Sequence, residues 1–507
     1  MTRLSSIANV LWGNKARFSY LFLAAAILLF TLLGAREIWT QEHRWADIVS
    51  GMFFRQDFLH PYLGMNRYYD KPLLSYWLIV AVAKLTGSLT TWTLRVPSAL
   101  SGLLAVWSIY KLGTKLKSRE MGLMAGWLML TTFYFLFWAR TSSADMLNLA
   151  GTLFAITWYM LHREKANFFH YAVFFLIVSL TALCKGLVGL IIPLIAVFVD
   201  ICLQKSWKQH LCWSLVLAAI PAALVYLFPF WASNHFGGES YGQSGLYMVF
   251  RENVLRYFQP FDHKGPIYTY FIYLPIYLLP WTFFFIPALV ALKGRWASLS
   301  INSKWIAWTL GILFLFFTLS GSRRSYYILP VVPFAILFTA DWLSAISSQA
   351  RRKQWAARAT IISYIVLLLG VDILPAWYYS QVGINRFAEE VKTAAIHEQP
   401  WDKWSVVLLD GESKLNFYLQ LPPTAQHFDV VGNREDSNTA SLLKAWPIMT
   451  NKPANTIFIT RKFYQPFIQA YFADYVVVDL PAPRFSFLKK EAIDAPVAFI
   501  PRQAKIF

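Results

Sequence analysis

The chain has 507 residues, of which 57% are hydrophobic, 18% are aromatic and only 14% are charged. Soluble proteins carry about 25% charged residues, so the composition excludes an ordinary soluble protein and predicts a polytopic membrane protein. The net charge of +19 does not indicate nucleic-acid binding, because residues 1–376 hold 32 Lys and Arg against 14 Asp and Glu while the remainder is nearly balanced. The excess belongs to the membrane part, where short basic loops set orientation.

A membrane-spanning helix needs about 20 mostly apolar residues. Eleven runs approach this length, and we expect an α-helical membrane protein with about 11 to 13 spans. The first run lacks a small-residue cleavage site, so it is expected to be retained as a span. The runs are 18–35, 94–112, 121–138, 147–162, 169–183, 186–203, 211–231, 269–292, 305–319, 327–345 and 357–376.

The short run 73–86 is interpreted as a helix lying at the membrane interface. If it crossed the membrane, the basic loop 113–120 would lie outside; as an interfacial helix it leaves every short basic loop on one side. The positive-inside rule makes that side the cytoplasm, together with the N-terminus. The opposite, periplasmic side then receives 36–93, 139–146, 184–186, 232–268, 320–326 and everything after 376.

After Trp377 the composition becomes that of a soluble domain, which places a membrane domain at 1–376 and a periplasmic α/β domain at 377–507. Helices are expected at 385–396, 413–419 and 463–472, and strands at 405–409, 427–431, 456–460 and 475–480.

Cofactor signatures are scarce. Cys184, Cys202 and Cys212 form no CxxC or CxxH spacing, which argues against a disulfide framework or a structural zinc site. No GxGxxG or GxxxxGK[ST] phosphate loop occurs, so the sequence requires no nucleotide cofactor. His263 beside Asp262 leaves a divalent metal open.

The polar segment 36–72 separates the first apolar run from the rest and is interpreted as an active-site loop. Glu42 is its candidate general base, with a loop salt bridge to Arg36 or Arg44 as the alternative. Asp70 is a second carboxylate of this loop. In place of a catalytic role, it has as alternatives an ion pair with Arg67 or a cap on the following helix. A further carboxylate, Asp145, ends the short outer loop ARTSSAD.

Several cations lie on the outer side against apolar runs, where the positive-inside bias makes them unusual. Taken singly, each has the alternative of snorkelling to lipid headgroups. Together they indicate a clamp for a phosphate or pyrophosphate. Pro72 at the first turn of a helix also favours an anion beside Lys71. The cations include Lys71, Lys185, Arg256, Lys264, Arg323 and Arg324.

Six segments, taken in order, resemble the polyprenyl-phosphate-sugar-dependent membrane glycosyltransferases of GT-C fold, a group that includes protein O-mannosyltransferases and the lipid A aminoarabinose transferase. A single segment would be weak, but six in the family's order are specific. They are QEHRWADI (41–48), DFLHPYLGMNRYYDKPLLSYWLI (57–79), ARTSSADM (139–146), CKGLVGL (184–190), ENVLRYFQPFDHKGPIYTY (252–270) and SRRSYYILPVVP (322–333).

The resemblance implies roles for individual residues. Glu42 falls in the family's acidic pair and Asp145 in the second outer loop, as catalytic carboxylates. Gln41 departs from the family, whose pair usually begins with Asp. Either Glu42 takes the role of the base, or no strong carboxylate base is needed, which would suit a phosphate acceptor that is already a nucleophile. The implied lipid-phosphate ligands are Lys71, Arg256 and Tyr327, with Arg323 and Lys185 nearby, and the implied substrate-loop residues are Tyr68, Tyr69, Asp70 and His263.

The expected function is periplasmic, inverting transfer of a sugar from undecaprenyl phosphate to an envelope acceptor at the bacterial inner membrane. The acceptor is expected to be lipid A or another glycolipid, with membrane lipids as further partners and no nucleic acid. Protein O-glycosylation with the same donor is the first alternative. A lipid-linked sugar flippase and a non-catalytic scaffold are the others, although transporters usually place ionisable residues in the middle of spans.

Overall fold

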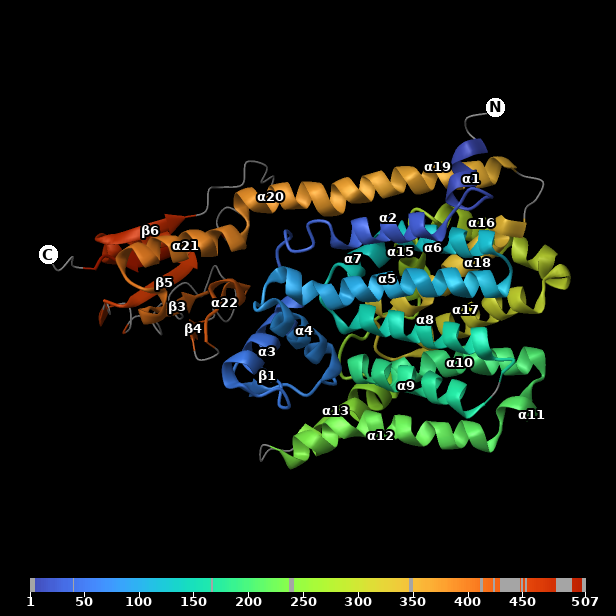
Figure 1. The fold of residues 1–507 in the computed structure, drawn as a ribbon. Coiled ribbons are helices and arrows are strands. Elements are labelled where there is room, and N and C mark those ends of the chain that lie inside the picture. Colours follow the sequence, from blue (N-terminus) through green and yellow to red (C-terminus); the bar gives the residue numbers. More distant parts are fainter. Residues whose placement is uncertain are drawn as a thin grey trace. The chain divides into compact units, whose positions relative to one another are not determined.

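The computed structural model describes residues 5–39, 41–165, 167–236, 241–345, 350–410, 414–422, 425–428, 447, 450–451, 454–479 and 495–503. The chain forms two compact units, each described by itself below (Figure 1). Unit 1 comprises Met1–Leu33, Phe58–Pro61 and Tyr68–Asp372, and unit 2 comprises Gly34–Asp57, Tyr62–Arg67 and Ile373–Phe507. The last segment of unit 2 begins at Ile373, close to the predicted boundary at 376. Unit 2 also takes in most of the predicted outer loop 36–72.

Unit 1 is helical, with long helices lying side by side; α5 packs against α8, α8 against α9, and α9 against α12 (Figure 1). Its helices are α1 (Ser5–Leu11), α2 (Phe18–Phe30), α4 (Leu74–Thr86), α5 (Thr91–Leu116), α6 (Arg119–Leu130), α7 (Phe133–Ala139), α8 (Ala144–His162), α9 (Phe168–Lys185), α10 (Val188–Gln204), α11 (Trp207–His210), α12 (Trp213–His235), α13 (Tyr241–Phe250), α14 (Arg256–Phe258), α15 (Thr269–Tyr277), α16 (Thr282–Arg295), α17 (Ile301–Leu319), α18 (Val332–Ala345) and α19 (Ala350–Leu367). Two π-helical turns, η1 (Arg251–Leu255) and η4 (Leu368–Ile373), and two 3-10 helices, η2 (Trp296–Ser298) and η3 (Ser325–Val331), complete it.

Within the described residues, five helical stretches are long and apolar enough to cross a membrane, or six if a bent pair counts as one span. The bent pair is α6 and α7, which meet at 70° within the run predicted as one span at 121–138. The predicted run 269–292 is likewise two helices, α15 and α16, because Pro280 lies between them and cannot continue a helical hydrogen-bond ladder. The polytopic helical class is confirmed, and the count of 11 to 13 spans stays a prediction.

The run interpreted as an interfacial helix is α4, which has 13 residues and is short for a span. It begins at Leu74, so Pro72 precedes the helix instead of occupying its first turn. Lys71 is therefore three residues upstream of the helix, and the predicted contribution of the helix end to anion binding at Lys71 is correspondingly smaller.

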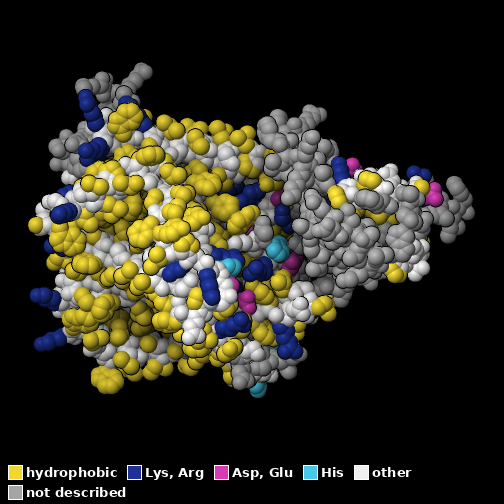
Figure 2. Space-filling view, turned by 180° about the vertical axis from the view of Figure 1, so that it is seen from behind, with side chains coloured by type: hydrophobic (Ala, Val, Ile, Leu, Met, Phe, Trp, Pro, Cys, Tyr) yellow, Lys and Arg dark blue, Asp and Glu magenta, His cyan; other side chains and the backbone are white. Residues whose placement is uncertain are grey.

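Hydrophobic side chains cover most of the surface of unit 1, and charged side chains gather towards its two ends (Figure 2). Arg140 is an exception that is buried inside. Its guanidinium lies 2.7 Å from the Asp372 carboxylate and donates to the backbone oxygens of Leu28 and Thr31 at 2.7 and 2.8 Å. Through these two backbone oxygens, Arg140 ties the end of α7 to the end of α2.

Unit 2 contains a five-stranded sheet in the order β4-β3-β5-β7-β6. The β3/β4 and β3/β5 pairs are parallel and the β5/β7 and β6/β7 pairs antiparallel. The elements are α3 (Glu42–Arg55), the hairpin β1 (Tyr62–Leu63) and β2 (Asn66–Arg67), α20 (Leu374–Val382), α21 (Ile384–Glu398), β3 (Ser405–Leu409), α22 (Lys414–Leu419), β4 (Gln426–Phe428), β5 (Thr456–Arg461), α24 (Gln465–Ile468), β6 (Tyr475–Asp479) and β7 (Pro496–Pro501).

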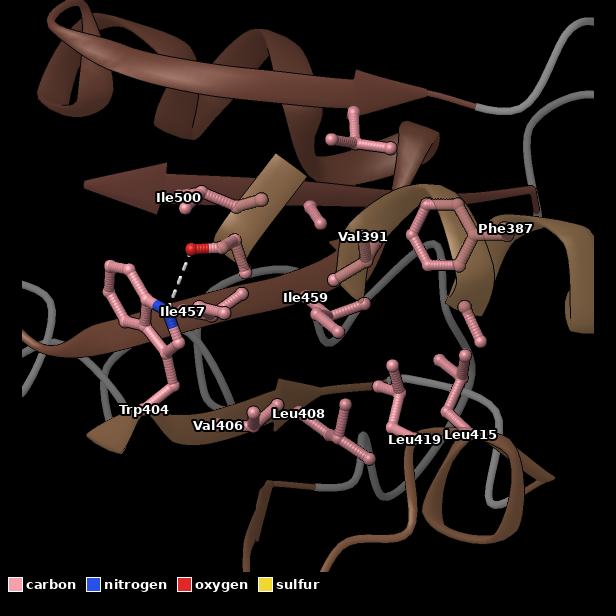
Figure 3. Close-up of a cluster of buried hydrophobic side chains, with 14 of the residues drawn as sticks. Phe387, Val391, Trp404, Val406, Leu408, Leu415, Leu419, Ile457, Ile459 and Ile500 are labelled. Atoms are coloured by element: carbon pink, nitrogen blue, oxygen red, sulfur yellow. Dashed lines mark hydrogen bonds between the residues drawn. The ribbon is translucent and has the colours of Figure 1, made fainter. Parts of the chain in front are cut away.

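Successive side chains of a strand point to opposite sides of a sheet. Both faces of this sheet are buried, each by its own hydrophobic cluster. Figure 3 shows Phe387 and Val391 of α21 beside Ile457, Ile459 and Ile500 on one face. Trp404 closes this cluster and donates its indole N–H to the Ala395 backbone oxygen at 3.1 Å. The other face is packed by Val407, Leu409, Phe458, Ile468, Phe472, Val497 and Phe499.

Most elements predicted for the C-terminal region are present with bounds shifted by one or two residues. The predicted strand 427–431 is β4, with 429–431 outside the described residues. The predicted helix 463–472 is broken into two 3-10 turns around the four-residue α24. The strand β7 was not predicted. It lies between β5 and β6 and pairs with both, so it connects β6 to the rest of the sheet.

Shortening Ile459 to alanine is expected to lower the free energy of unfolding of unit 2 by about 2–4 kcal/mol, because a fully buried methyl-rich side chain is replaced by a cavity. Thermal unfolding of the full-length protein in detergent, read by limited proteolysis of unit 2, measures the change. Val477→Ala on β6, where the side chain is 39% exposed, is the matched control. Equal losses from both variants would contradict the proposed core.

Candidate active site

Three of the predicted cations lie together in unit 1, each against a carboxylate. This cation cluster consists of Lys71, Lys185 and Arg256 with the carboxylates Asp145, Glu252 and Asp262. The residues come from four stretches far apart in sequence. The structure therefore brings these four stretches together in unit 1.

Glu252 is the central carboxylate of the cluster. It contacts the Arg256 guanidinium directly and lies 3.8 Å from Lys71 Nζ, so a single carboxylate serves two cations. Its side chain is 9% exposed, and this burial strengthens both interactions relative to water. A second carboxylate, Asp262, lies 2.5 Å from the other guanidinium nitrogen of Arg256.

The local backbone places these side chains. Residues 251–255 form a π-helical turn followed directly by α14, so Glu252 and Arg256 lie four residues apart on one helical face. Single π-helical turns are rare and occur frequently at functional sites. The sequence segment ENVLR carries this spacing, but it does not show that Glu252 also reaches Lys71. Glu252 is the site residue whose role the sequence reasoning missed.

Lys185 is the last residue of α9, and its Nζ lies 2.5 Å from the Asp145 carboxylate at the first turn of α8. The following residue, Gly186, has φ +104°, a conformation that favours glycine. A side chain at Gly186 would come within 3.0 Å of the Asn253 amide, so α9 ends directly against the π-helical turn. This close approach brings Lys185 to the same site as Glu252.

Tyr327 also belongs to this site, since its ring centroid lies 5.5 Å from Lys185 Nζ. It follows the loop 320–324, in which Ser322 accepts a hydrogen bond from Arg256 Nε at 3.2 Å. Tyr327 is the third residue of the 3-10 helix η3. It is therefore held near both Lys185 and Arg256. This position is consistent with the prediction that Tyr327 binds the lipid phosphate.

Arg323 has a structural role in the same loop. Its guanidinium donates to the backbone oxygens of Thr318 and Gly265 at 3.0 and 2.6 Å, and its own backbone N–H donates to the His263 oxygen at 2.8 Å. It thus joins the loop 320–324 to the segment containing His263. Phosphate binding by Arg323 stays a prediction.

The predicted substrate-loop residues lie on the two sides of the cluster. His263 Nε2 is 3.1 Å from Asp262, which is also the partner of Arg256. Asp70 contributes its backbone oxygen, which accepts from Lys71 Nζ at 3.2 Å. Tyr68 and Tyr69 precede Lys71 in the chain, and the Tyr68 N–H donates to the Pro61 oxygen at 2.9 Å. Their contact with substrate stays a prediction.

Glu42 belongs to unit 2, where it opens α3 and is almost fully buried. Its carboxylate accepts a hydrogen bond from the Trp39 backbone N–H at 2.8 Å and lies 3.6 Å from the Arg36 guanidinium. The salt bridge to Arg36 is thus the alternative that the sequence left open. Gln41 precedes the helix and makes no capping bond through its side chain. The role of Glu42 as a base stays a prediction.

Among the described residues there is no group of three or more His, Cys, Asp and Glu side chains arranged to hold a metal ion. The carboxylates of the cation cluster are instead engaged by Lys and Arg. This cluster is suited to binding an anion with several negatively charged oxygens. Such a ligand can replace the carboxylates as the partner of the three cations.

Comparisons with known proteins identify a matching family and similar relatives. Residues 70–231 match the family described as dolichyl-phosphate-mannose-protein mannosyltransferase. The undecaprenyl phosphate-alpha-4-amino-4-deoxy-L-arabinose arabinosyl transferase of Shewanella sediminis is 27% identical over 416 residues, which covers 78% of this chain and 73% of that protein.

Two solved structures have the same fold. ArnT from Cupriavidus metallidurans bound to undecaprenyl phosphate matches with a TM-score of 0.70 and 16% identity, over 95% of this chain and 97% of that one. The oligosaccharyltransferase of Archaeoglobus fulgidus matches with a TM-score of 0.52 and 11% identity, over 90% of this chain and 70% of that one.

The chain therefore has the fold of these two solved structures, and its residues 70–231 match one family of glycosyltransferases. It is similar over most of its length to the aminoarabinose transferases that use undecaprenyl phosphate. The resemblance expected from the six sequence segments is therefore confirmed.

Glu252→Gln is expected to strengthen binding of undecaprenyl phosphate about tenfold, because it removes the negative charge that competes with the lipid phosphate for Lys71 and Arg256. Titration of the purified protein, followed by native mass spectrometry, measures this. The control is Glu164→Gln, since Glu164 is exposed and pairs with Lys115 outside the cluster. Unchanged or weaker binding in Glu252→Gln would mean that the carboxylate does not compete with phosphate.

Lys71 is expected to take up a proton when the lipid phosphate binds at a pH between its lowered pKa in the free protein and its higher pKa in the complex. Burial lowers the pKa of Lys71, and the positive charges of Arg256 and Lys185 lower it further, although Glu252 and Asp70 oppose this. A bound phosphate raises the pKa again, so affinity should fall as the pH rises through the lowered value. Calorimetry in buffers of different ionisation enthalpy measures the uptake. Lys71→Arg should bind without it, and uptake in that variant would assign the proton to another group.

Proposed function

We propose that this enzyme transfers 4-amino-4-deoxy-L-arabinose from undecaprenyl phosphate to lipid A on the periplasmic side of the bacterial inner membrane. The observation that carries the proposal is the cation cluster, in which three cations from separate loops lie at one site in a helical unit of GT-C fold. The undecaprenyl phosphate named for the relatives supplies a phosphate that such a cluster would bind. The sugar follows from the name of the same relatives.

The reaction would proceed in one displacement at the anomeric carbon. An oxygen of the acceptor phosphate forms the new bond to that carbon while the bond to the lipid phosphate breaks, with inversion. The departing oxygen keeps the bonding electron pair, so undecaprenyl phosphate leaves with one more negative charge than it had in the donor. Lys71, Arg256 and Tyr327 would stabilise that developing charge, as preorganised donors do in other transfer reactions.

The carboxylates have separate roles in this proposal. Asp145 orients Lys185 through their 2.5 Å contact, which holds the ammonium group at the site. Glu252 keeps Lys71 and Arg256 together when no phosphate is bound. Glu42 would act as the base for an acceptor that needs deprotonation. A phosphate acceptor is already ionised at neutral pH, so its reaction depends less on that base.

The topology in this proposal follows the positive-inside rule. The N-terminus is cytoplasmic, and the cluster and the C-terminal α/β domain are periplasmic. Protein O-glycosylation is the second candidate, because the matched family carries the name of a protein mannosyltransferase. It shares the donor site and differs only in the acceptor, so an experiment on products distinguishes the two.

Lys71→Ala and Arg256→Ala are each expected to lower product formation about 100- to 1,000-fold, as removal of one charge-stabilising donor does elsewhere. The measurement is mass spectrometry of lipid A from a deletion strain complemented with each variant, with Lys115→Ala as the control outside the cluster. Glycoproteins from the same cells are compared in parallel. Loss of a protein-linked sugar with unchanged lipid A would replace the proposed acceptor with a protein, and full activity of both variants would remove the cluster from the reaction.

A further inference from the structure

Unit 2 contains a second polar site that the proposed reaction does not use. It is a cavity of about 390 Å³ formed by the segment after α2 and by α20, α21 and α22. This volume lies within the range of about 300–1,000 Å³ typical of small-molecule sites. Its lining residues are Gly34, Ala35, Arg36, Glu37, Ala376, Tyr379, Ser380, Asn385, Arg386, Glu389 and Tyr418.

The walls of the cavity are fixed to one another. Glu37 accepts a hydrogen bond from the Ile384 backbone N–H at 2.5 Å and lies 3.6 Å from Lys414. The Tyr418 hydroxyl accepts from the Ile38 backbone N–H at 2.9 Å. These contacts join the segment 34–38 to α21 and α22. The cavity is therefore preformed, and a ligand need not order it on binding.

The cavity continues along α21 into a more open recess of about 480 Å³ that shares Arg386 and Glu389 and adds Thr393 and His397. We name the two together the headgroup groove. Arg386 lies where they meet, with its side chain 41% exposed, and it donates to Glu390 at 2.9 Å and to the Ser380 backbone oxygen at 3.2 Å. The groove is thus longer than a single sugar ring requires.

The chemistry of the groove is that of a phosphorylated sugar site. Arg36 and Arg386 supply guanidinium groups that suit phosphate oxygens. Glu37, Glu389 and Asn385 supply oxygens that accept hydrogen bonds from sugar hydroxyl or amino groups. Aromatic side chains with a polar tip, here Tyr379 and Tyr418, pack against sugar rings while bonding to their edges.

Apolar side chains adjoin this polar groove on α20. Leu374 and Trp377 are 57% and 54% exposed, and Ile373, the last residue of η4 just before α20, is 42% exposed; along the chain they flank Ala376 of the cavity wall. Along the chain, α19 is followed by the π-helical turn η4 and then by α20, and three residues separate Gly34 from the end of α2. A polar groove beside exposed apolar residues at the ends of membrane helices is suited to an amphiphile.

We propose that the headgroup groove binds the phosphorylated sugar headgroup of an outer-leaflet glycolipid, with the acyl chains against α20. This inference rests on the proposed function, in which it makes the groove the acceptor site. The same phosphate chemistry is present in bulk phospholipids, so the experiment compares the two sources.

Two variants test the groove in different ways. Arg386→Gln removes the guanidinium charge, and Ala376→Phe fills the cavity while every polar side chain is kept. Arg502→Gln, an exposed arginine of unit 2 outside the groove, is the matched control. Affinities for purified lipid A, phosphatidylethanolamine and undecaprenyl phosphate are measured on the full-length protein in detergent by native mass spectrometry.

Both groove variants are expected to weaken lipid A binding about tenfold or more and to leave undecaprenyl phosphate binding unchanged. In a transfer assay the KM for the acceptor should rise by a similar factor, with kcat changed less than twofold. Unchanged lipid A affinity in both variants would overturn the proposal. Equal losses for lipid A and phosphatidylethanolamine would also overturn it, because the groove would then be a site for bulk lipid.

The outcomes separate this inference from the proposed function. If the wild type binds lipid A through the groove but transfers no sugar, the groove stands and the proposed reaction fails. If the wild type transfers the sugar and neither groove variant changes the acceptor KM, the reaction stands and the groove fails. The lipid A binding arm needs no catalytic turnover, so each result is interpretable by itself.

Discussion

The shared contact of Glu252 with Lys71 and Arg256 is the interaction on which the site depends. Two cations close together in a poorly hydrated position repel each other strongly, and a buried charge without a partner is costly. One carboxylate between them makes the empty site stable. In the proposed function, a lipid phosphate, which carries the same sign as Glu252 and more acceptor oxygens, replaces it as the partner of both cations.

The backbone around this contact is built to hold it. The π-helical turn η1 sets Glu252 and Arg256 on one face, and Gly186 lets the end of α9 approach Asn253 closely. Arg323 closes the arrangement by joining two loops through their backbone oxygens. The helices of unit 1 also supply cluster residues directly, because Lys185 ends α9 and Asp145 lies in the first turn of α8.

Unit 2 depends on a different constraint, the burial of both faces of one sheet. The apolar strands 405–409 and 456–460 are recognisable in the sequence because they are continuous apolar runs, as expected for strands covered on both sides. Strand β7 was missed because Pro496 and Pro501 bound it and it follows a stretch without a clear pattern. The helix predicted at 463–472 is broken, since Pro466 removes a backbone donor near its start.

The sequence by itself determined the class of the protein and which loops carry its charge. Hydrophobic runs and the placement of Lys and Arg report on membrane insertion directly, because each residue interacts with the bilayer separately. It also identified Lys71, Arg256 and Lys185 as cations in an unusual place, on the outer side against apolar runs, and Asp145 as a carboxylate in a short outer loop. Only the tertiary structure decided that Glu252 also contacts Lys71 and that Asp145 contacts Lys185, because these partners lie far apart in the chain. Pairing at such separations is set by how the helices pack, which no local pattern records.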